Sequence, residues 1–206
     1  AAHRIDVEDD GPGFTAFRIE RILELPAGIE RTDKGMFPSE ETVRVPITMR
    51  ITLADDVPGV RVNITVDNTA CDHKLTVLLP TGIDNDEYFA SQAFGMVTRK
   101  GGMNHDTDHW KEAEPVEKNF ADIIGKRDGA GDGIAFVSAG GLKEGADYGD
   151  GEGTLAVTLF RSFQSTIMTN GEPGGQVQRE MTFDFALCLL DAGTTFADLQ
   201  RGQQHL

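Results

Sequence analysis

The chain has 206 residues, and its 19 lysines and arginines against 34 aspartates and glutamates give a net charge of −15 with neutral histidines. Such an acidic chain repels phosphate groups, so we expect neither nucleic acid nor an anionic membrane as a partner. The sequence lacks a run of roughly 20 apolar residues that would span a membrane. Its N-terminal residues lack the features of a signal peptide. The compartment stays open, with the cytoplasm favoured.

The length predicts one large domain over residues 1–206. Cys71 and Cys188 both lie in apolar-patterned segments, and we expect buried thiols rather than a disulfide. The 24 glycines and 8 prolines separate short segments in which apolar and polar residues alternate. This spacing of glycine and proline is typical of many short strands joined by turns, and it predicts an all-β protein.

The alternation is clearest over residues 43–53 and 60–66, which we interpret as a hairpin with its turn at 55–59. Pro46 cannot donate to a neighbouring strand, so we expect it at a sheet edge or a bulge. A short turn at 120–124 is the best helical candidate. Further strands are predicted at 17–25, 74–79, 94–98, 134–137, 155–161 and 177–188.

In the last of these strands Met181, Phe183, Phe185 and Leu187 share one face, with Ala186 on the other. Most predicted strands have one apolar face, which two antiparallel sheets packed face to face would bury. We therefore expect a large antiparallel β-sandwich. The polar segments 100–132 and 140–153 are predicted to be long surface loops.

Four passages, in the same order along the chain, resemble the C-terminal β-domain of glycoside hydrolase family 38 α-mannosidases. The first, at 60–82, is a strand followed by D-N and D-H-(basic)-L, and the second, at 133–137 with 141–144, is a strand followed by a G-L-x-E turn. The third, at 154–162, is an L-T-L-(apolar)-R-S strand. The fourth, at 173–176 with 181–187, is a glycine-rich loop before T-F-x-(aromatic)-A-L. One departure is Gly145, where the family usually has tyrosine.

The resemblance implies a galactose mutarotase-like supersandwich that forms a late part of a retaining α-mannosidase. Its partners would be its own N-terminal catalytic domain and the α-mannoside substrate, and a homo-oligomer is possible. In the family that catalytic domain holds zinc with two aspartates and two histidines, and one of these aspartates attacks the anomeric carbon. We expect no catalytic residue, metal ligand or cofactor in the present chain, which alone should be inactive.

The loop Asn170–Gln176 is where the chain is expected to approach the substrate. In the family this loop lies near the sugar pocket, which makes Gly174, Gly175 and Gln176 the substrate-proximal candidates. Glycine lets the backbone approach a ligand closely, and a glutamine amide both donates and accepts hydrogen bonds. The alternative is a hairpin connection whose glycines only accommodate positive φ.

Several other groups of polar or aromatic residues are better explained by structural roles than by catalysis or ligand binding. His105–His109 crowds four possible metal ligands into five residues, but a glycine-flanked polar loop favours a solvated loop over a metal site. His73 with Glu87 or Glu144 could form an acid/base pair, although a turn histidine bonded locally is commoner. Trp110 is a sugar-stacking platform or, more simply, a cover over apolar surface.

Arg99 and Arg161 end strand-like segments and could pair with carboxylates or contact sugar hydroxyls. Turn capping is the favoured role of Asp67, Asn68 and Asp72, because Asp and Asn side chains bond nearby backbone amides. Two other function classes stay open, a stand-alone carbohydrate-binding module and an oligomerisation module. One Trp and two Tyr supply little material for a binding platform, and an oligomerisation module would expose a large apolar patch.

Overall fold

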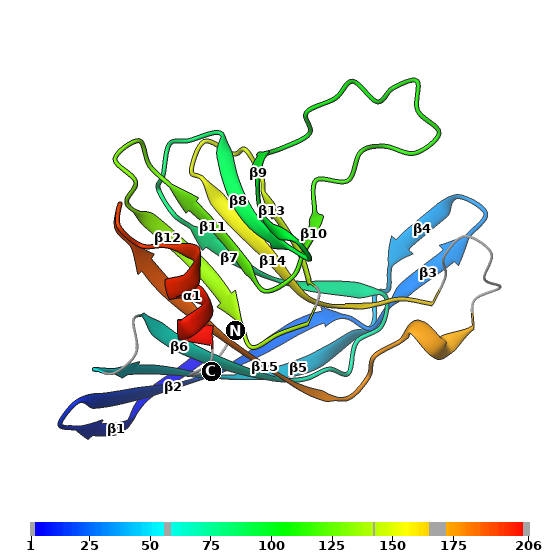
Figure 1. Cartoon of the computed structure of the whole chain (residues 1–206). Coiled ribbons are helices and arrows are strands. Elements are labelled where there is room, and N and C mark those ends of the chain that lie inside the picture. The colour runs from blue at the N-terminus through cyan, green and yellow to red at the C-terminus, as the bar shows by residue number, and fades with distance from the viewer. Residues whose placement is uncertain (1–2, 56–58, 142, 165–171, 204–206) are drawn as a thin grey trace. The chain divides into compact units, whose positions relative to one another are not determined.

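The computed structural model describes residues 3–55, 59–141, 143–164 and 172–203. Within these ranges the chain is mostly β-strand, with a 3₁₀ turn η1 (Pro173–Gly175) and a helix α1 (Phe196–Gln203) (Figure 1). The strands are β1 (His3–Gly11), β2 (Phe14–Pro26), β3 (Ile29–Thr32), β4 (Gly35–Pro38), β5 (Thr42–Ala54), β6 (Val60–Asp67), β7 (His73–Pro80), β8 (Glu87–Gln92), β9 (Gly95–Lys100), β10 (Lys118–Phe120), β11 (Ile123–Arg127), β12 (Gly133–Ser138), β13 (Lys143–Asp147), β14 (Thr154–Ser162) and β15 (Glu180–Leu190).

The strands form a nine-stranded sheet in the order β1-β2-β5-β6-β15-β12-β11-β8-β9, a four-stranded sheet β10-β13-β14-β7, and the hairpin β3-β4. The predicted all-β class is confirmed, and each strand expected from alternation is present with slightly different ends. Contacts between Cα atoms divide the chain into two compact units. Unit 1 comprises residues 1–54, 62–75 and 159–183, and unit 2 comprises 55–61, 76–158 and 184–206. A single domain over 1–206 stays a prediction.

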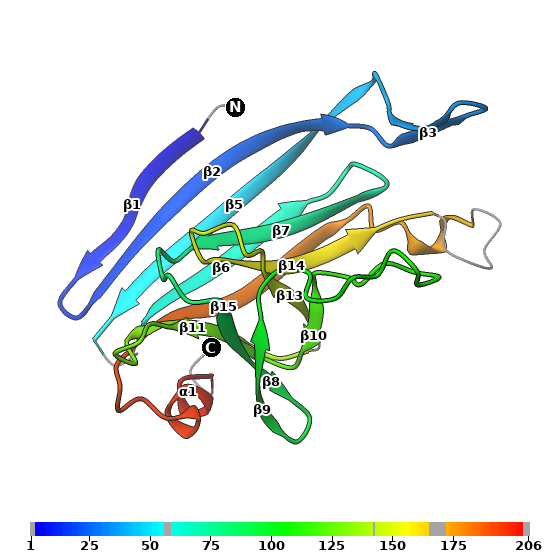
Figure 2. The same ribbon diagram turned by 90° about the horizontal axis from the view of Figure 1, so that it is seen from above.

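In unit 1 a long antiparallel ribbon is formed by β1, β2 and β5, which lie side by side in Figure 2. Its register places Ile19 between Ile5 and Met49, so apolar residues share one face of the ribbon. Because strand side chains alternate, a slip of one residue would turn this whole face over. The apolar pattern of the sequence therefore specifies the pairing.

Pro46 corrects one expectation, because it lies in an interior strand rather than at an edge. It is opposite Ile22 of β2, and β5 has β6 on its other side. The 13 residues of β5 outnumber the 8 of β6, so part of β5 has no partner in β6. A missing N–H is tolerated where no strand needs it.

In unit 2 two sheets pack face to face, as predicted for a sandwich. Phe120 of β10 meets Phe136 of β12 edge to face, with ring centroids 6.4 Å apart. Gly145 of β13 has no room for a side chain, since a Cβ there would lie within 3 Å of Ile124 and Phe120. A glycine that looks like a loop residue in the sequence therefore lets two sheets approach closely.

The helix prediction was wrong in position. Phe120 ends β10 and Ile123 begins β11, and both side chains are fully buried. The helix lies instead at α1, where Thr195 and Asp198 exchange hydrogen bonds in a capping box. The sequence Thr-Phe-Ala-Asp carries this signal, although its helix is only two turns long.

Both long-loop predictions were too long. The segment 100–132 contains β10 and β11, and 140–153 contains β13, which leaves 101–117 as the long connection that projects in Figure 1. The face prediction for β15 needs a similar correction. Phe185 is buried as expected, but Ala186 is buried too, within a cluster that includes Leu199 of α1. Strand β15 is thus covered on both faces near its C-terminal end.

Both cysteines are free thiols, as expected, with Cys188 buried and Cys71 half-buried. Burial raises the pKa of each thiol. Within the described residues, the chain has no helix of the length and apolar character needed to cross a membrane.

Candidate functional site

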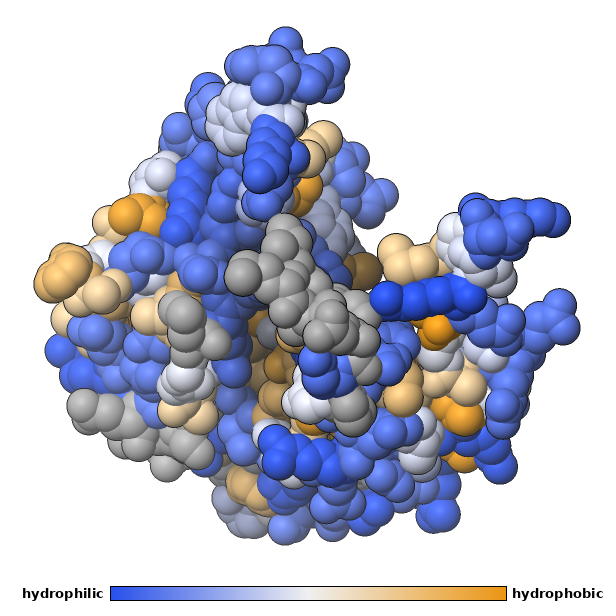
Figure 3. All heavy atoms as spheres, turned by 90° about the vertical axis from the view of Figure 1, so that its right-hand side faces the viewer, coloured by the Kyte–Doolittle hydropathy of each residue, from blue (hydrophilic) through white to orange (hydrophobic). Residues whose placement is uncertain are grey.

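A surface cleft of about 510 Å³ lies in unit 1. Hairpin β3-β4, the start of β7 and the end of β14 supply its walls. The described residues that line it are Ile29, Arg31, Met36, Asp72, His73, Lys74, Arg161, Ser162 and Phe163. Figure 3 looks at the side of the molecule that carries this hairpin, and apolar residues (orange) are exposed there among charged ones.

Asp72 and Gln176 form the centre of a hydrogen-bond network beside this cleft. The Gln176 Nε2 donates to Asp72 Oδ1 over 2.7 Å, and the Asp72 backbone N–H donates to Gln176 Oε1 over 3.1 Å. Ser162 Oγ also donates to Gln176 Oε1 over 2.8 Å and accepts from the Val177 N–H. Both ends of the Gln176 amide are therefore bonded to the protein.

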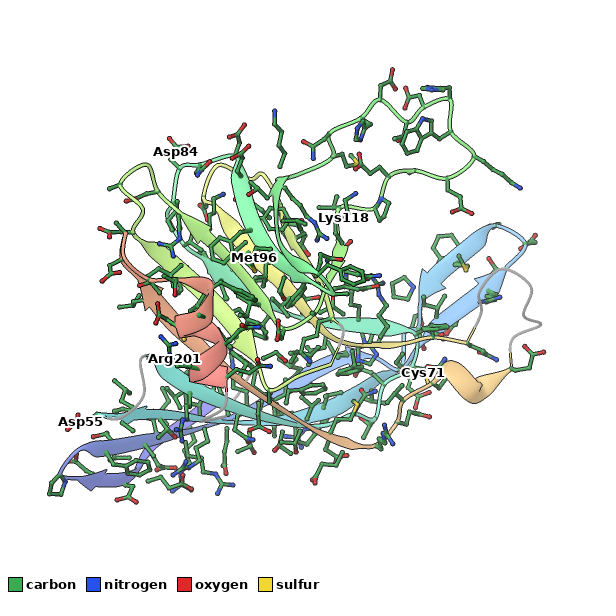
Figure 4. All side chains as sticks on the ribbon, viewed as in Figure 1. Asp55, Cys71, Asp84, Met96, Lys118 and Arg201 are labelled. Carbon is green, nitrogen blue, oxygen red and sulfur yellow. The ribbon has the colours of Figure 1, made fainter. Side chains whose placement is uncertain are left out.

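The backbone at Asp72 is unusual, with a φ of 53°. Asp is one of the few non-glycine residues that adopt this left-handed conformation readily. Its Oδ1 also accepts from the Gln164 N–H over 3.0 Å. The position directly follows Cys71, which is labelled in Figure 4. Predicted as a local turn cap, Asp72 instead joins segments distant in sequence.

Asn68 has the predicted capping role. Its Oδ1 accepts from the Ala70 N–H over 3.2 Å, and its Nδ2 donates to the carbonyl oxygens of Ala70 and Val177. The side chain is buried with both ends of its amide satisfied. It fixes the connection between β6 and β7 against the chain that leads into β15.

Gly174 and Gly175 lie in η1, and their surroundings differ. A Cβ on Gly175 would overlap the carbonyl oxygen of Phe163 and lie 3.1 Å from its ring. The Phe163 N–H also donates to the Gly175 carbonyl over 3.0 Å. A Cβ on Gly174 would meet no atom of the described residues within 4 Å. Gly175 is thus packed against the protein, whereas the backbone of Gly174 is open to approach. Asn170 and Gly171, the first residues of the predicted loop, lie outside the described residues.

His73 contributes an imidazole to the cleft wall. Its ring packs edge-on against Phe160, with centroids 5.3 Å apart. Burial lowers the pKa of His73, although a hydrogen bond with the Cys71 backbone and the charge of Asp72 oppose this shift. Its Nδ1 is buried. Glu87 and Glu144, considered as acid/base partners, belong to unit 2.

The His105–His109 segment lies on the projecting connection 101–117. His105 Nδ1 is 3.0 Å from Glu114 Oε2, and Lys118, labelled in Figure 4, donates to Glu114 Oε1 over 2.7 Å. These bonds from Lys118 and His105 lower the pKa of Glu114 to about 2. Across the described chain, no three His, Cys, Asp or Glu side chains form a group able to hold a metal ion.

Trp110 is half exposed on the same connection and stacks on His105, with ring centroids 5.9 Å apart. Arg99 donates to the Asn119 carbonyl over 2.9 Å, whereas Arg161 lines the cleft. Arg31, Lys74 and Ser162 also line the cleft, and none of them is predicted as a site residue from the sequence. No sequence motif marks these residues as a site. They lie near one another only because three strands that are distant in sequence come together in the fold.

Comparison with known proteins places the chain by its fold. No protein-family model matches the sequence, and no curated protein matches it. An α-mannosidase from Enterococcus faecalis V583 has a similar structure, with a TM-score of 0.83 and 21% identity over 98% of this chain and 24% of that chain. A glycosyl hydrolase family 38 protein from Enterococcus faecalis has a TM-score of 0.81 and 20% identity over the same shares. The predicted likeness to this family is confirmed in the fold, and the chain spans about a quarter of those proteins.

Proposed function

We propose that the chain is the C-terminal β-sandwich domain of a larger retaining α-mannosidase of glycoside hydrolase family 38. In this role it scaffolds an N-terminal catalytic domain and presents Gly174, Gly175 and Gln176 near the sugar pocket. The observation that carries the proposal is a fold match over 98% of this chain but 24% of an α-mannosidase. The four sequence passages in family order support it.

The residues of the cleft fit a supporting rather than a catalytic role. Retaining glycosidases place two carboxyl groups about 5 to 5.5 Å apart, one as nucleophile and the other as acid and then base. Among the described residues that line the cleft, Asp72 is the one carboxylate. Its Oδ1 already accepts two hydrogen bonds. We therefore assign the reacting carboxylates to the rest of the larger polypeptide.

Zinc belongs to the same proposal. The described residues offer no group of three metal-ligating side chains, so they do not fit a zinc site. The catalytic domain would supply those ligands. What this chain offers the substrate is backbone and amide groups, and the open backbone of Gly174 is best placed for a sugar to approach.

The test is hydrolysis of an activated α-mannoside by the 206-residue chain and by the longer protein of its full reading frame. We expect no turnover by the chain alone, with or without added zinc, and turnover by the longer protein that a chelator removes. Zinc-dependent turnover by the chain alone would contradict the assignment of the reacting groups. A longer protein that leaves α-mannosides intact would overturn the proposed function.

A further inference from the structure

Among the described residues that line the cleft of unit 1, basic side chains outnumber acidic ones. The chain has a net charge of −15. Among the described residues that line the cleft, three are basic, Arg31, Lys74 and Arg161, and Asp72 is the single acid. A local excess of positive charge in an acidic protein attracts anions to that place selectively.

The three basic residues converge from separate parts of the fold. Arg31 lies on β3, whereas Lys74 and Arg161 lie on β7 and β14, which are neighbours in the four-stranded sheet. All three side chains are exposed, and each carries several N–H donors. A bound anion can therefore share these donors with the contacts that they make within the protein.

Asp72 leaves the basic excess in place. Its single negative charge offsets one of the three positive charges, and its Oδ1 accepts hydrogen bonds from neutral donors, the Gln176 amide and the Gln164 N–H. The wall also contains the buried Nδ1 of His73. Ile29, Met36 and Phe163 add apolar surface against which an uncharged part of a ligand can pack.

We propose that this cleft binds a small anionic ligand, whose phosphate or carboxylate group lies between Arg31, Lys74 and Arg161. Guanidinium groups match such oxyanions through paired N–H donors. A volume of about 510 Å³ suits a small molecule rather than a bare ion. The inference does not depend on α-mannosidase activity, since it concerns the charge and shape of the cleft.

The experiment measures binding to the 206-residue chain by titration calorimetry. The probes are inorganic phosphate, glucuronate as a sugar carboxylate, and methyl α-mannoside as an uncharged sugar. We expect saturable binding of phosphate or glucuronate at one site, weakened by added salt, and the stronger of the two identifies the anionic group. Saturable binding of neither anion would overturn the proposal.

Variants locate the site. Arg31→Gln and Arg161→Gln should each weaken anion binding about tenfold, which corresponds to roughly 1.4 kcal/mol. Lys34→Gln is the control, because Lys34 is exposed on the same hairpin and does not line the cleft. Its affinity should stay within about twofold of the unchanged chain. Circular dichroism confirms folding of each variant. Equal weakening by Lys34→Gln would show that only net charge matters, and would reject the cleft as the site.

Discussion

Gln176 and Asp72 lie 104 residues apart in the sequence and are joined by two hydrogen bonds, one in each direction. The pair ties η1 to the start of β7, and Ser162 adds the end of β14 to the same network. Three segments that line or flank the cleft are thus held by one glutamine amide. The residue proposed to lie near the substrate is also a structural one.

Replacement of Gln176 by alanine should therefore lower stability. Gln176→Ala removes two bonds with Asp72 and one with Ser162, and a typical net contribution of about 0.5 to 1.5 kcal/mol for each bond predicts a loss of about 1.5 to 4.5 kcal/mol. Urea unfolding measures it. Gln178→Ala is the control, because its amide donates one exposed bond, to the Thr69 carbonyl. Similar small losses in both variants would show that the network contributes little.

The two glycines of η1 should respond differently to the same added methyl group. Gly175→Ala forces a Cβ into the Phe163 carbonyl and should cost about 1 to 3 kcal/mol as an overpacked site. Gly174→Ala should be nearly neutral, because its Cβ would meet no atom within 4 Å in the part of the chain that the structure describes. Comparison of their urea midpoints checks the prediction. A larger loss at Gly174 would contradict the described packing.

A substitution at Gly174 tests the substrate-proximal role in the longer protein. Gly174→Val should leave the thermal midpoint almost unchanged and lower kcat/KM for an α-mannoside, because it fills the open approach to the backbone. A tenfold decrease would correspond to about 1.4 kcal/mol of lost transition-state binding. Unchanged kcat/KM in a folded Gly174→Val protein would return the loop to a plain connection.

The sequence predicts eight of the fifteen described strands, because their apolar faces repeat every second residue, as over 43–53. The strands that it misses are β1, β3, β4, β8, β10, β11 and β13. At β13, Gly145 and the charged residues around it look like a loop. There the strand exists because a glycine fits between Ile124 and Phe120, a fact of tertiary packing. The helix α1 was missed because a two-turn helix carries little periodicity.

The candidate site also has a part that could be predicted from the sequence and a part that could not. Gly174, Gly175 and Gln176 could be selected from a resemblance, since their motif is continuous in sequence. The contact of Gln176 with Asp72 could not, because it crosses 104 residues. The basic cleft could not be predicted either, because Arg31, Lys74 and Arg161 come together only when the hairpin β3-β4 folds beside β7 and β14.

The central strand β15 offers a graded test of burial. Phe185 is 2% exposed and stacks on Phe136 at 4.5 Å between centroids, so Phe185→Ala should cost about 3 to 5 kcal/mol. Phe183 is only half buried against Phe160, and Phe183→Ala should cost less. Thr182→Ala, on the exposed face, should cost least. Equal losses in urea unfolding at all three positions would show that the register of β15 is wrong.

Lys126 and Asp147 form a buried ion pair in unit 2, with 2% and 1% of their side chains exposed. Lys126→Met should cost about 3 to 5 kcal/mol, because it leaves a carboxylate buried without its partner. The double variant Lys126→Met with Asp147→Leu should lose less than Lys126→Met, since no charge is then stranded.

The surface pair Arg18 and Glu20 supplies the control for this ion pair. Both side chains are nearly half exposed, with 2.8 Å between Arg18 Nη2 and Glu20 Oε1. Arg18→Met should cost under about 1 kcal/mol, because water and salt screen an exposed pair. Urea unfolding of all three variants at neutral pH decides the matter. If Lys126→Met costs no more than Arg18→Met, water reaches Asp147 in solution. If the double variant is the least stable, the pair stabilises the fold beyond the cost of burying its charges.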